Sequence, residues 1–455
     1  MKLTKLKEFS VISRKLGFAA ILVVAMMGLT MQSAKSALTG KGLLHPVNHF
    51  PTWFSDVNGV TLQLCLDGDG LTGLCSFDPV IPGNPTSLAT GFGAEAFWWL
   101  ANATLDVAGG GRAILVLALE AAYGQGDPAP NDQFAFGRVR LRVDIPADGE
   151  YKIWHPALNE TNGCQPEVYT ATAGIKAINV TRDTGGGVPF DTMLTGEVGP
   201  FLTWDPAISP LAPAGYVGDP NVNHEVVGGH CGINYFRIEA PVGVDLDGNG
   251  NNFVQTNLFS IAGKIHDENS SPPGIESVRT SYSRTTAAGF VTTSRINSWV
   301  KAPPHATVVL SDVPQANQNG SMTFDGDSIF FKRATLSAAN SNPMPAQLTV
   351  TATNANGMST VQVVNVVDQV EIDSVGWTKP LARLKVVAFS SDKIHPAAGI
   401  IPELTLHVGA NSYPMPQVGA PGRYEVLLPG LFPVPPARVT VTSSRGGVDT
   451  QGLAD

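Results

Sequence analysis

Hydrophobic and polar residues alternate through much of the chain with a period of two. Residues 138–144 show this most clearly, because Val139, Leu141 and Val143 are separated by charged residues. A period of two places these three side chains on one face of a β-strand and the charges in water, as in an antiparallel sheet with one solvated face. Residues 113–119 are continuously apolar and predict a strand buried on both faces, although a helix is the alternative for so short a run.

The same criterion predicts strands in every other part of the chain. They lie at residues 60–66, 151–155, 176–181, 235–239, 258–265, 277–284, 290–299, 307–310, 348–353, 370–375, 383–389, 404–408, 423–428 and 439–443. Turn-forming residues separate them. The composition agrees, because 48 Gly and 34 Pro with only 15% charged residues leave no long run of helix formers. We therefore predict an all-β protein.

One phrase of seven residues occurs twice. Residues 345–351 read Pro-Ala-Gln-Leu-Thr-Val-Thr and residues 436–442 read Pro-Ala-Arg-Val-Thr-Val-Thr, so the copies start 91 positions apart. A period of this length is typical of one β-sandwich domain. Asn-Ala-Asn-Gly at 354–357 and Ser-Arg-Gly-Gly at 444–447 then close the last strand of each copy with turn residues.

These patterns divide the chain into four predicted parts after its N-terminal segment. Residues 37–265 predict one large β-sandwich domain, which we call the head. Residues 266–273 are polar and end in Pro-Pro, which predicts a semi-rigid linker. The two copies of the repeat follow as the first module, residues 274–366, and the second module, residues 367–455.

The two modules resemble the immunoglobulin-like and fibronectin-type β-sandwiches of exported bacterial proteins. In each copy an aromatic residue precedes a long alternating strand, Tyr282 in the first and Trp377 in the second. Neither copy contains a Cys, so the disulfide of true immunoglobulin domains is absent, and the resemblance implies a fold without an active site. The head is similar to uncharacterised bacterial secreted proteins at residues 199–202, 234–239, 257–259 and 263–265, which implies no function.

The N-terminus has the pattern of an export signal. Basic residues precede an apolar run at residues 18–31, and Ala34-Lys35-Ser36 fits a cleavage site. We predict a signal peptide at residues 1–36 and a secreted or cell-surface protein, with a retained signal anchor as the alternative. Cleavage would remove six Lys or Arg and one Glu, which takes the net charge from −9 to −14. This charge argues against attraction to nucleic acid or an anionic membrane, and no later stretch has the roughly 18 apolar residues of a membrane span.

The chain has four cysteines, and an even number in an exported protein predicts two disulfides. Three pairings are possible. We expect Cys65–Cys75 and Cys164–Cys231, because the first pair brackets a short loop rich in turn residues. Zinc binding is the alternative, but the spacings match no zinc pattern.

The sharpest local motif is Asp-Leu-Asp-Gly-Asn-Gly-Asn at residues 245–251. Oxygen-bearing side chains at alternate positions, with glycines that allow a tight turn, can surround a hard cation. The motif resembles the calcium loops of exported bacterial proteins, with Asp245, Asp247 and Asn249 as ligands. The twelfth position is Thr256 where an EF-hand has Glu, so a weak calcium site is predicted, and a polar hairpin turn without metal is the alternative.

Two weaker metal candidates remain. Asp67 and Asp69 follow Cys65 in a shorter version of the same pattern, where the disulfide loop alone is the alternative. Four histidines of the head form two pairs in the sequence that could bind copper or zinc if the pairs meet. These residues are His45, His49, His224 and His230.

Motifs of nucleophilic catalysis are missing, which leaves carboxylates as the candidates for an enzyme. The sequence contains no Gly-x-Ser-x-Gly, His-Glu-x-x-His or phosphate-binding glycine loop. A polysaccharide hydrolase would need two carboxyl groups that face each other across a cleft of the head. The acids of one glycine-rich stretch are candidates, with solvated loop acids as the alternative; they are Asp183, Asp191, Glu197 and Asp205.

Aromatic residues cluster at Trp53-Phe54 and at Phe97-Trp98-Trp99. Consecutive residues of a strand point to opposite faces, so Trp98 or Trp99 is expected to face outward, where it could stack on a sugar ring. Packing of these rings in the core is the favoured alternative.

Together these patterns favour a non-enzymatic extracellular binding or structural protein. Its head would carry the binding surface, calcium would stiffen a head loop, and the two modules would space or dock the head. A surface glycan or another extracellular protein is the expected partner. A secreted hydrolase with its site in residues 38–265 and a histidine-based metal-binding protein are the alternative functions.

Overall fold

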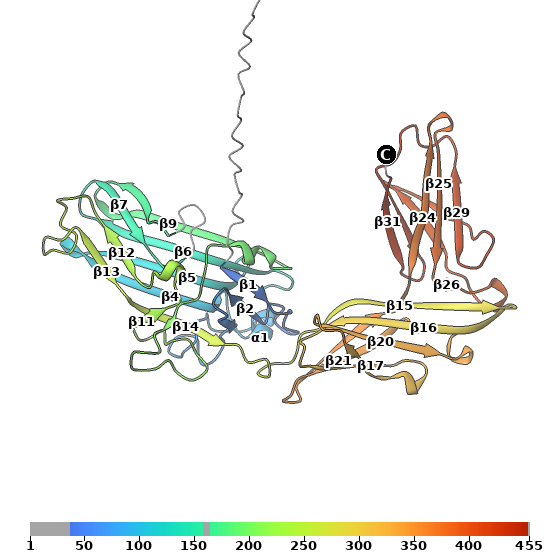
Figure 1. Ribbon diagram of the computed structural model, residues 1–455, viewed down its shortest axis with the longest axis horizontal. Helices are drawn as coiled ribbons and strands as arrows, with labels where there is room; N and C mark the ends of the chain where they lie inside the picture. Colours follow the sequence, from blue (N-terminus) through green and yellow to red (C-terminus); the bar gives the residue numbers. More distant parts are fainter. Residues whose placement is uncertain (1–36, 158–163, 454–455) are drawn as a thin grey trace, which may run out of the picture. The chain divides into compact units, whose positions relative to one another are not determined.

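The computed structural model describes residues 37–157 and 164–453 (Figure 1). The predicted signal peptide lies outside the described residues. Within them the fold is all-β, as predicted, and the α-helix is the short α1 (Pro85–Thr90). No helix in this part of the chain is long and apolar enough to cross a membrane.

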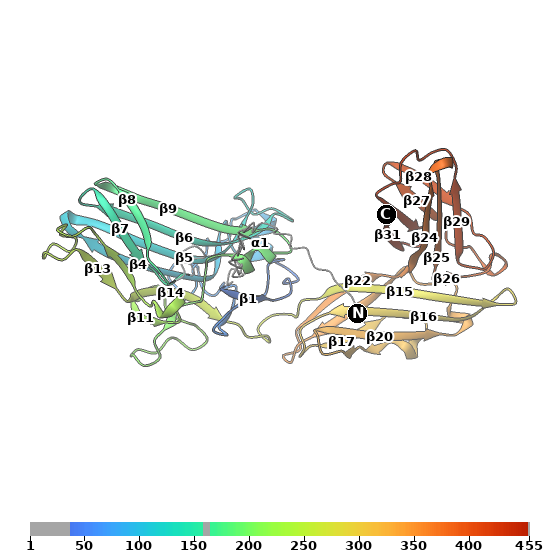
Figure 2. The ribbon, with the colours of Figure 1, turned by 45° about the horizontal axis from the view of Figure 1, so that its top comes forward.

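Two sheets form the head (Figure 2). The larger sheet has the order β1-β2-β3-β14-β4-β5-β6-β9, with β10 and β11 beside β14. Its strands are β1 (Leu38–Lys41), β2 (Trp53–Asp56), β3 (Thr61–Gln63), β4 (Ala96–Val107), β5 (Gly111–Tyr123), β6 (Gln133–Ile145), β9 (Gly174–Gly186), β10 (Thr203–Trp204), β11 (His224–Val227) and β14 (Leu258–Ile265). The smaller sheet has the order β13-β12-β7-β8, with β7 (Gly149–Trp154), β8 (Glu167–Ala171), β12 (Phe236–Glu239) and β13 (Phe253–Thr256).

The two sheets bury one core between them, and the head is therefore a β-sandwich. The apolar segment predicted at 113–119 lies in β5, between β4 and β6, and residues 117–123 are all buried. The strand prediction is confirmed, and the helix alternative is wrong. The charges of β6 do not simply face water, because Arg138, Arg140 and Arg142 are half-buried.

The expectation that Trp98 or Trp99 faces outward is wrong. Both rings are buried, and the indole N–H groups donate to the carbonyl oxygens of Pro51 and Leu202, at 3.2 and 3.1 Å. Strict alternation fails because the register of β4 against β5 shifts between Phe97 and Trp99. Such a β-bulge changes the direction of successive side chains.

The two modules are sandwiches with matching sheets. In the first, β19-β20-β16-β15-β23 faces β18-β17-β21-β22; in the second, β24-β25-β29 faces β28-β27-β30-β31. The strands of the first are β15 (Glu276–Ala287), β16 (Phe290–Lys301), β17 (Thr307–Ser311), β18 (Gly320–Ser321), β19 (Thr323–Phe324), β20 (Ile329–Leu336), β21 (Gln347–Thr353) and β22 (Ser359–Asn365). The strands of residues 367–455 are β23 (Val367–Asp368), β24 (Val370–Thr378), β25 (Arg383–Ser390), β26 (Asp392–Lys393), β27 (Leu404–Val408), β28 (Asn411–Met415), β29 (Arg423–Leu428), β30 (Arg438–Ser443) and β31 (Val448–Gly452). Of these, β23 and β26 pair with β15 of the first module.

The repeated phrase has the same place in both modules. Its first copy forms β21, which pairs with β17 and β22, and its second copy forms β30, which pairs with β27 and β31. Three clusters of buried hydrophobic side chains lie along the chain, and each falls within the head, the first module or the second module.

A buried ion pair joins β15 of the first module to β26. Arg284 donates from Nε and Nη2 to the two carboxylate oxygens of Asp392, at 2.8 and 2.7 Å, and the two side chains are 3% and 0% exposed. The Tyr282 hydroxyl donates to the same carboxylate at 2.8 Å. Strand β15 also pairs in parallel with β23 and β26, so backbone and side chains hold the same junction.

We expect the Asp392→Asn variant to lose about 3–5 kcal/mol of stability, because it leaves the buried Arg284 guanidinium without its counter-charge. Urea unfolding of the full chain measures this loss. The control Glu425→Gln breaks the partly exposed pairs with Lys385 and Arg423 and should change much less. The double variant Arg284→Met/Asp392→Leu should recover much of the loss. A single Asn variant as stable as the wild type would contradict this account.

Candidate functional site

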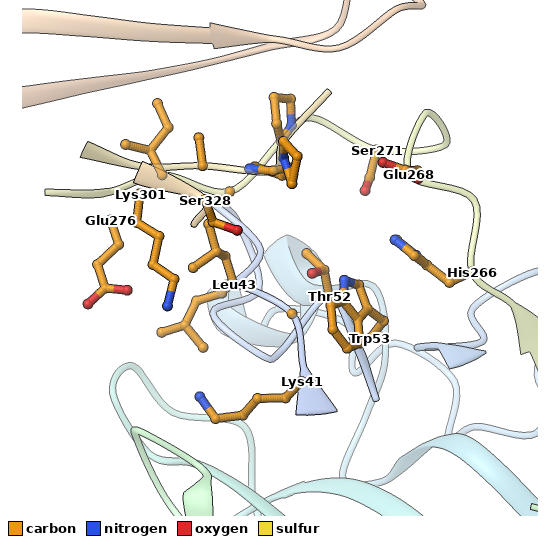
Figure 3. A pocket seen from close by; sticks show the side chains of 18 of the residues that line it. Lys41, Leu43, Thr52, Trp53, His266, Glu268, Ser271, Glu276, Lys301 and Ser328 are labelled. Atoms are coloured by element: carbon orange, nitrogen blue, oxygen red, sulfur yellow. The ribbon is translucent and has the colours of Figure 1, made fainter. Parts of the chain in front are cut away.

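A pocket of about 740 Å³ lies where β1 and β2 of the head meet residues 266–276 and 301–305. Figure 3 shows Thr52, Trp53 and His266 at one side of this pocket, with Lys301 and Glu276 at the other. The lining thus combines one large aromatic ring with cations, carboxylates and prolines. A site of this size and mixture suits an organic ligand with both apolar and polar groups.

The position of Trp53 depends on Gly42, which directly follows β1. The Gly42 N–H donates to the Trp53 carbonyl at 2.8 Å. A Cβ added at Gly42 would lie 2.8 Å from the indole Cδ1 and Nε1 atoms and 2.1 Å from Thr52 Oγ1. Only glycine therefore lets the ring lie against β1. The indole is half-buried, which leaves part of it for a ligand.

His266 is the second ring of the pocket, with its centroid 6.1 Å from that of Trp53. Burial lowers the pKa of His266, although Glu268 and Asp267 oppose the shift. Its Nδ1 is buried and has no hydrogen-bond partner among the described residues. A buried polar atom without a partner is costly.

The predicted calcium loop connects β12 to β13. The Asp247 carboxylate accepts N–H groups of Asn249 and Asn251 at 2.8 and 3.0 Å and the Asn251 side-chain amide at 2.7 Å, and Asp245 accepts the Gly248 N–H at 2.7 Å. Hydrogen bonds from Asn251 and Asn249 lower the pKa of Asp247 to about 2. Asp247 is therefore charged at neutral pH, and the donors of the loop already occupy part of the acceptor capacity of both carboxylates.

The weaker pair of acids lies in the loop closed by the Cys65–Cys75 disulfide. Asp67 contacts Lys264 Nζ at 2.6 Å and the Tyr216 hydroxyl at 2.5 Å, so this carboxylate already has a counter-charge. Asp69 accepts hydrogen bonds from Thr72, which lower its pKa to about 2.

Both expected disulfides are present, Cys65–Cys75 and Cys164–Cys231. The four predicted histidines do not form one site. His45 Nδ1 accepts backbone N–H groups of its own turn, and the ring of His224 stacks on Trp204 with centroids 4.3 Å apart. Within residues 37–157 and 164–453, the one group of His, Cys, Asp or Glu that could hold a metal is Cys164, His230 and Cys231, whose sulfurs are already bonded to each other.

The four acids proposed for a hydrolase each have a partner. Asp183 forms a bidentate pair with Arg138 at 2.9 Å, Glu197 contacts Arg182 at 2.7 Å, and Asp191 contacts Lys41 at 3.3 Å. Asp205 accepts the Ala207 N–H at 2.9 Å. None of these four acids lines the 740 Å³ pocket.

Sequence reasoning missed two buried carboxylates. Glu120 of β5 is 2% exposed, and burial raises its pKa to about 8 even though Arg138 lies 3.2 Å away. Glu167 of β8 is also buried, but hydrogen bonds from His155 and Tyr169 and the charge of Arg182 outweigh that burial and hold its pKa well below the usual range. Glu120 interrupts an otherwise apolar strand, and this interruption was the available signal.

No family model and no curated protein matches this chain. Among solved structures, titin tandem immunoglobulin domains match at 15% identity over 40% of this chain and 94% of that chain, with a TM-score of 0.14. A tetra-tandem repeat from the extending region of a large adhesion protein matches at 13% identity, over 79% and 94%, with a TM-score of 0.13. Dimeric latent PorU from Porphyromonas gingivalis matches at 10% identity, over 71% and 31%, with a TM-score of 0.16. The fold class therefore rests on the sheets described above.

We expect Glu120→Gln to become more stable relative to the wild type as the pH rises. Between the usual pKa of 4.5 and the raised value of about 8, the unfolded chain releases the Glu120 proton while the folded chain keeps it. Wild-type stability therefore falls across this window, by at most about 1.4 kcal/mol per pH unit. Urea unfolding at about pH 5 and about pH 8 measures the difference.

The matched control is Glu150→Gln, at an exposed position of β7. It should follow the wild-type profile. Parallel profiles for Glu120→Gln and the wild type would show that the buried carboxyl group does not retain its proton.

Proposed function

We propose that this chain is an exported, non-enzymatic binding protein whose ligand is a surface glycan. The half-buried Trp53 in the pocket supports this proposal most directly, because the face of an indole ring packs well against the apolar face of a sugar. The lysines and glutamates of the lining supply partners for sugar hydroxyls.

The charge pattern of the head favours binding over catalysis. A general acid and its partner carboxylate must both reach the substrate. The candidate acids of the glycine-rich stretch are held by Arg138, Arg182 and Lys41, or by a backbone N–H. Glu120 has the raised pKa of a general acid, but it contacts Arg138 and does not line the 740 Å³ pocket.

The role of the modules in this proposal is mechanical. The buried pair between Arg284 and Asp392 stiffens their junction, and two disulfides brace the head. Disulfides also fit an oxidising compartment outside the cytoplasm. Calcium at Asp245, Asp247 and Asn249 would further hold the turn between β12 and β13.

A glycan array tests the binding function. We expect the full chain to bind at least one surface glycan, and Trp53→Ala to bind it about tenfold more weakly, since an aromatic contact contributes on the order of 1 kcal/mol. Trp154→Ala is the matched control, because this half-buried indole of the head does not line the pocket. Equal binding by the wild type and Trp53→Ala would exclude the pocket, and no bound glycan would overturn the proposed function.

Elemental analysis of protein purified without chelator tests the calcium component. We expect about one equivalent of calcium and a higher melting temperature when calcium is added, because a ligand at 100 times its Kd stabilises the folded state by about 2.7 kcal/mol. Asp245→Asn/Asp247→Asn should lose both effects. Asp127→Asn, in another exposed loop of the head, should keep them. A calcium effect that survives in the double variant would place the ion elsewhere.

A further inference from the structure

The outer face of one sheet in the first module carries an unusual set of side chains. Strands β15, β16 and β20 lie side by side (Figure 1), and β19 pairs with the free edge of β20. The register of these strands forms three consecutive rows across the sheet. The rows are Arg279–Trp299–Phe331–Thr323, Ser281–Asn297–Arg333 and Ser283–Arg295–Thr335. We call this surface the arginine–aromatic face.

Alternation along the strands directs these side chains away from the core. Their neighbours Tyr282, Ile296, Val300, Phe330 and Ala334 are all buried in the core of the first module. Residues of the opposite parity therefore lie on the outer side. Arg279, Arg295 and Arg333 are exposed and Trp299 and Phe331 are half-buried, so the face is accessible at its arginines and rings. Ser281, at the centre of β15, is buried.

The rings and guanidinium groups form a continuous ladder. The Arg279 guanidinium lies 4.3 Å from the centre of the Trp299 ring, which lies 5.0 Å from the Phe331 ring. Arg333 lies 5.9 Å from Phe331, and its Nε donates to Asn297 Oδ1 at 3.0 Å. Contact with a ring orients a guanidinium, whose remaining N–H donors lie in one plane and suit a carboxylate.

The charge of this face is opposite to that of the whole protein. Its ten positions include three arginines and no acid, whereas the chain has a net charge of −9. In the described part of the chain, none of the three arginines forms an ion pair with Asp or Glu. The nearest acid in register is Glu276, which lies opposite Lys301 beyond the end of the ladder.

We propose that the arginine–aromatic face binds an acidic polysaccharide. Uronic acid polymers repeat two chemical features along one chain, a carboxylate and the apolar face of a sugar ring. The ladder repeats the complementary features, because a guanidinium pairs with a carboxylate in a bidentate manner and the aromatic surface packs on the ring. Neighbouring strands are about 4.8 Å apart, so the first row, which crosses four strands, offers a contact surface about 14 Å wide. This second site is separate from the pocket and goes beyond the proposed function.

Single-stranded nucleic acid also binds surfaces that combine arginines with aromatic rings. The net charge of the chain does not separate the two ligands, because a uronic acid polymer also brings one negative charge per unit. The face offers only three arginines to pair with the anionic groups of a ligand. A polymer in which each carboxylate comes with a full sugar ring fits this small face better.

Titration calorimetry with an octamer of galacturonic acid tests the proposal, and the fully methyl-esterified octamer is the control for charge. We expect the chain to bind the acidic octamer with an affinity that falls as salt is added. Its affinity for the ester should be lower by at least about tenfold. Arg279→Gln/Arg333→Gln should bind the acid at least about tenfold more weakly. Arg295→Gln removes an exposed arginine that contacts no ring and should lose about threefold, in a variant whose melting temperature stays unchanged.

Two control variants distinguish binding at this face from general charge attraction and from binding in the pocket. Arg438→Gln removes one exposed positive charge from β30, and Trp53→Ala disables the pocket; both should bind the acidic octamer within about twofold of the wild type. Equal binding of acid and ester, equal losses in Arg438→Gln and the face variants, or loss in Trp53→Ala would overturn the proposal. Tighter binding of an oligothymidylate than of the acidic octamer would overturn the proposal in favour of nucleic acid. Binding of neither ligand would also overturn the proposal.

Discussion

The buried pair of Arg284 and Asp392 is the interaction on which the C-terminal half depends. Removing both charges from water costs several kcal/mol per ion, so the pair is tolerable only where the geometry is close to ideal. Here both carboxylate oxygens accept a guanidinium N–H, Tyr282 adds a hydroxyl, and Arg284 Nη1 also donates to the Ser341 carbonyl at 3.2 Å. These bonds can form together only when β15 and β26 keep their parallel register. The pair thus ties β26 of the second module to one position on β15 of the first.

The same strand, β15, links this ion pair to the arginine–aromatic face. Arg284 and Tyr282 lie near the junction, while Arg279 of the same strand contacts Trp299 on the outer face. Eleven register positions join β15 to β16, so the ladder of rings and arginines is built on a strand that is held from both sides. Binding to such a face requires little ordering of the backbone, which favours affinity for a flat, extended ligand.

The head shows how the number of donors decides the state of a buried carboxyl group. Glu167 receives hydrogen bonds from His155, Tyr169 and Arg182, which stabilise its charged form enough to outweigh desolvation. Glu120 has one contact with Arg138, and that guanidinium is bidentate to Asp183. The remaining attraction does not offset burial, so the neutral form of Glu120 is favoured. Two glutamates of one β-sandwich therefore differ in charge near neutral pH.

The sequence predicted those features that depend on local pattern. Period-two alternation identified β6, a continuous apolar run identified β5, and the repeated phrase identified β21 and β30 as equivalent strands. Local pattern did not reveal the bulge that buries both Trp98 and Trp99, because a bulge depends on the register with β5. Arg284 was also invisible, since nothing near residue 284 distinguishes a buried arginine from those that face water.

The candidate sites visible in the sequence lie in loops, where glycines and acids stand out, whereas the strongest surface lies across strands. Trp299 and Phe331 are 32 positions apart and become neighbours only through the pairing of β16 with β20. A similar row crosses the small sheet of the head, where Arg237 lies 4.0 Å from the centre of the Phe253 ring and 5.6 Å from that of Trp154.

In the head, however, Glu239 contacts Arg237 at 3.2 Å and cancels its charge. Arg279, Arg295 and Arg333 of the first module have no such partner among the described acids. The same residue types can thus be structural in one sheet and open to a ligand in another, and the difference is the presence of one carboxylate two positions along the strand. A cross-strand row is therefore best judged by its uncompensated charge, and by that measure the first module, more than the head, carries the surface suited to an acidic ligand.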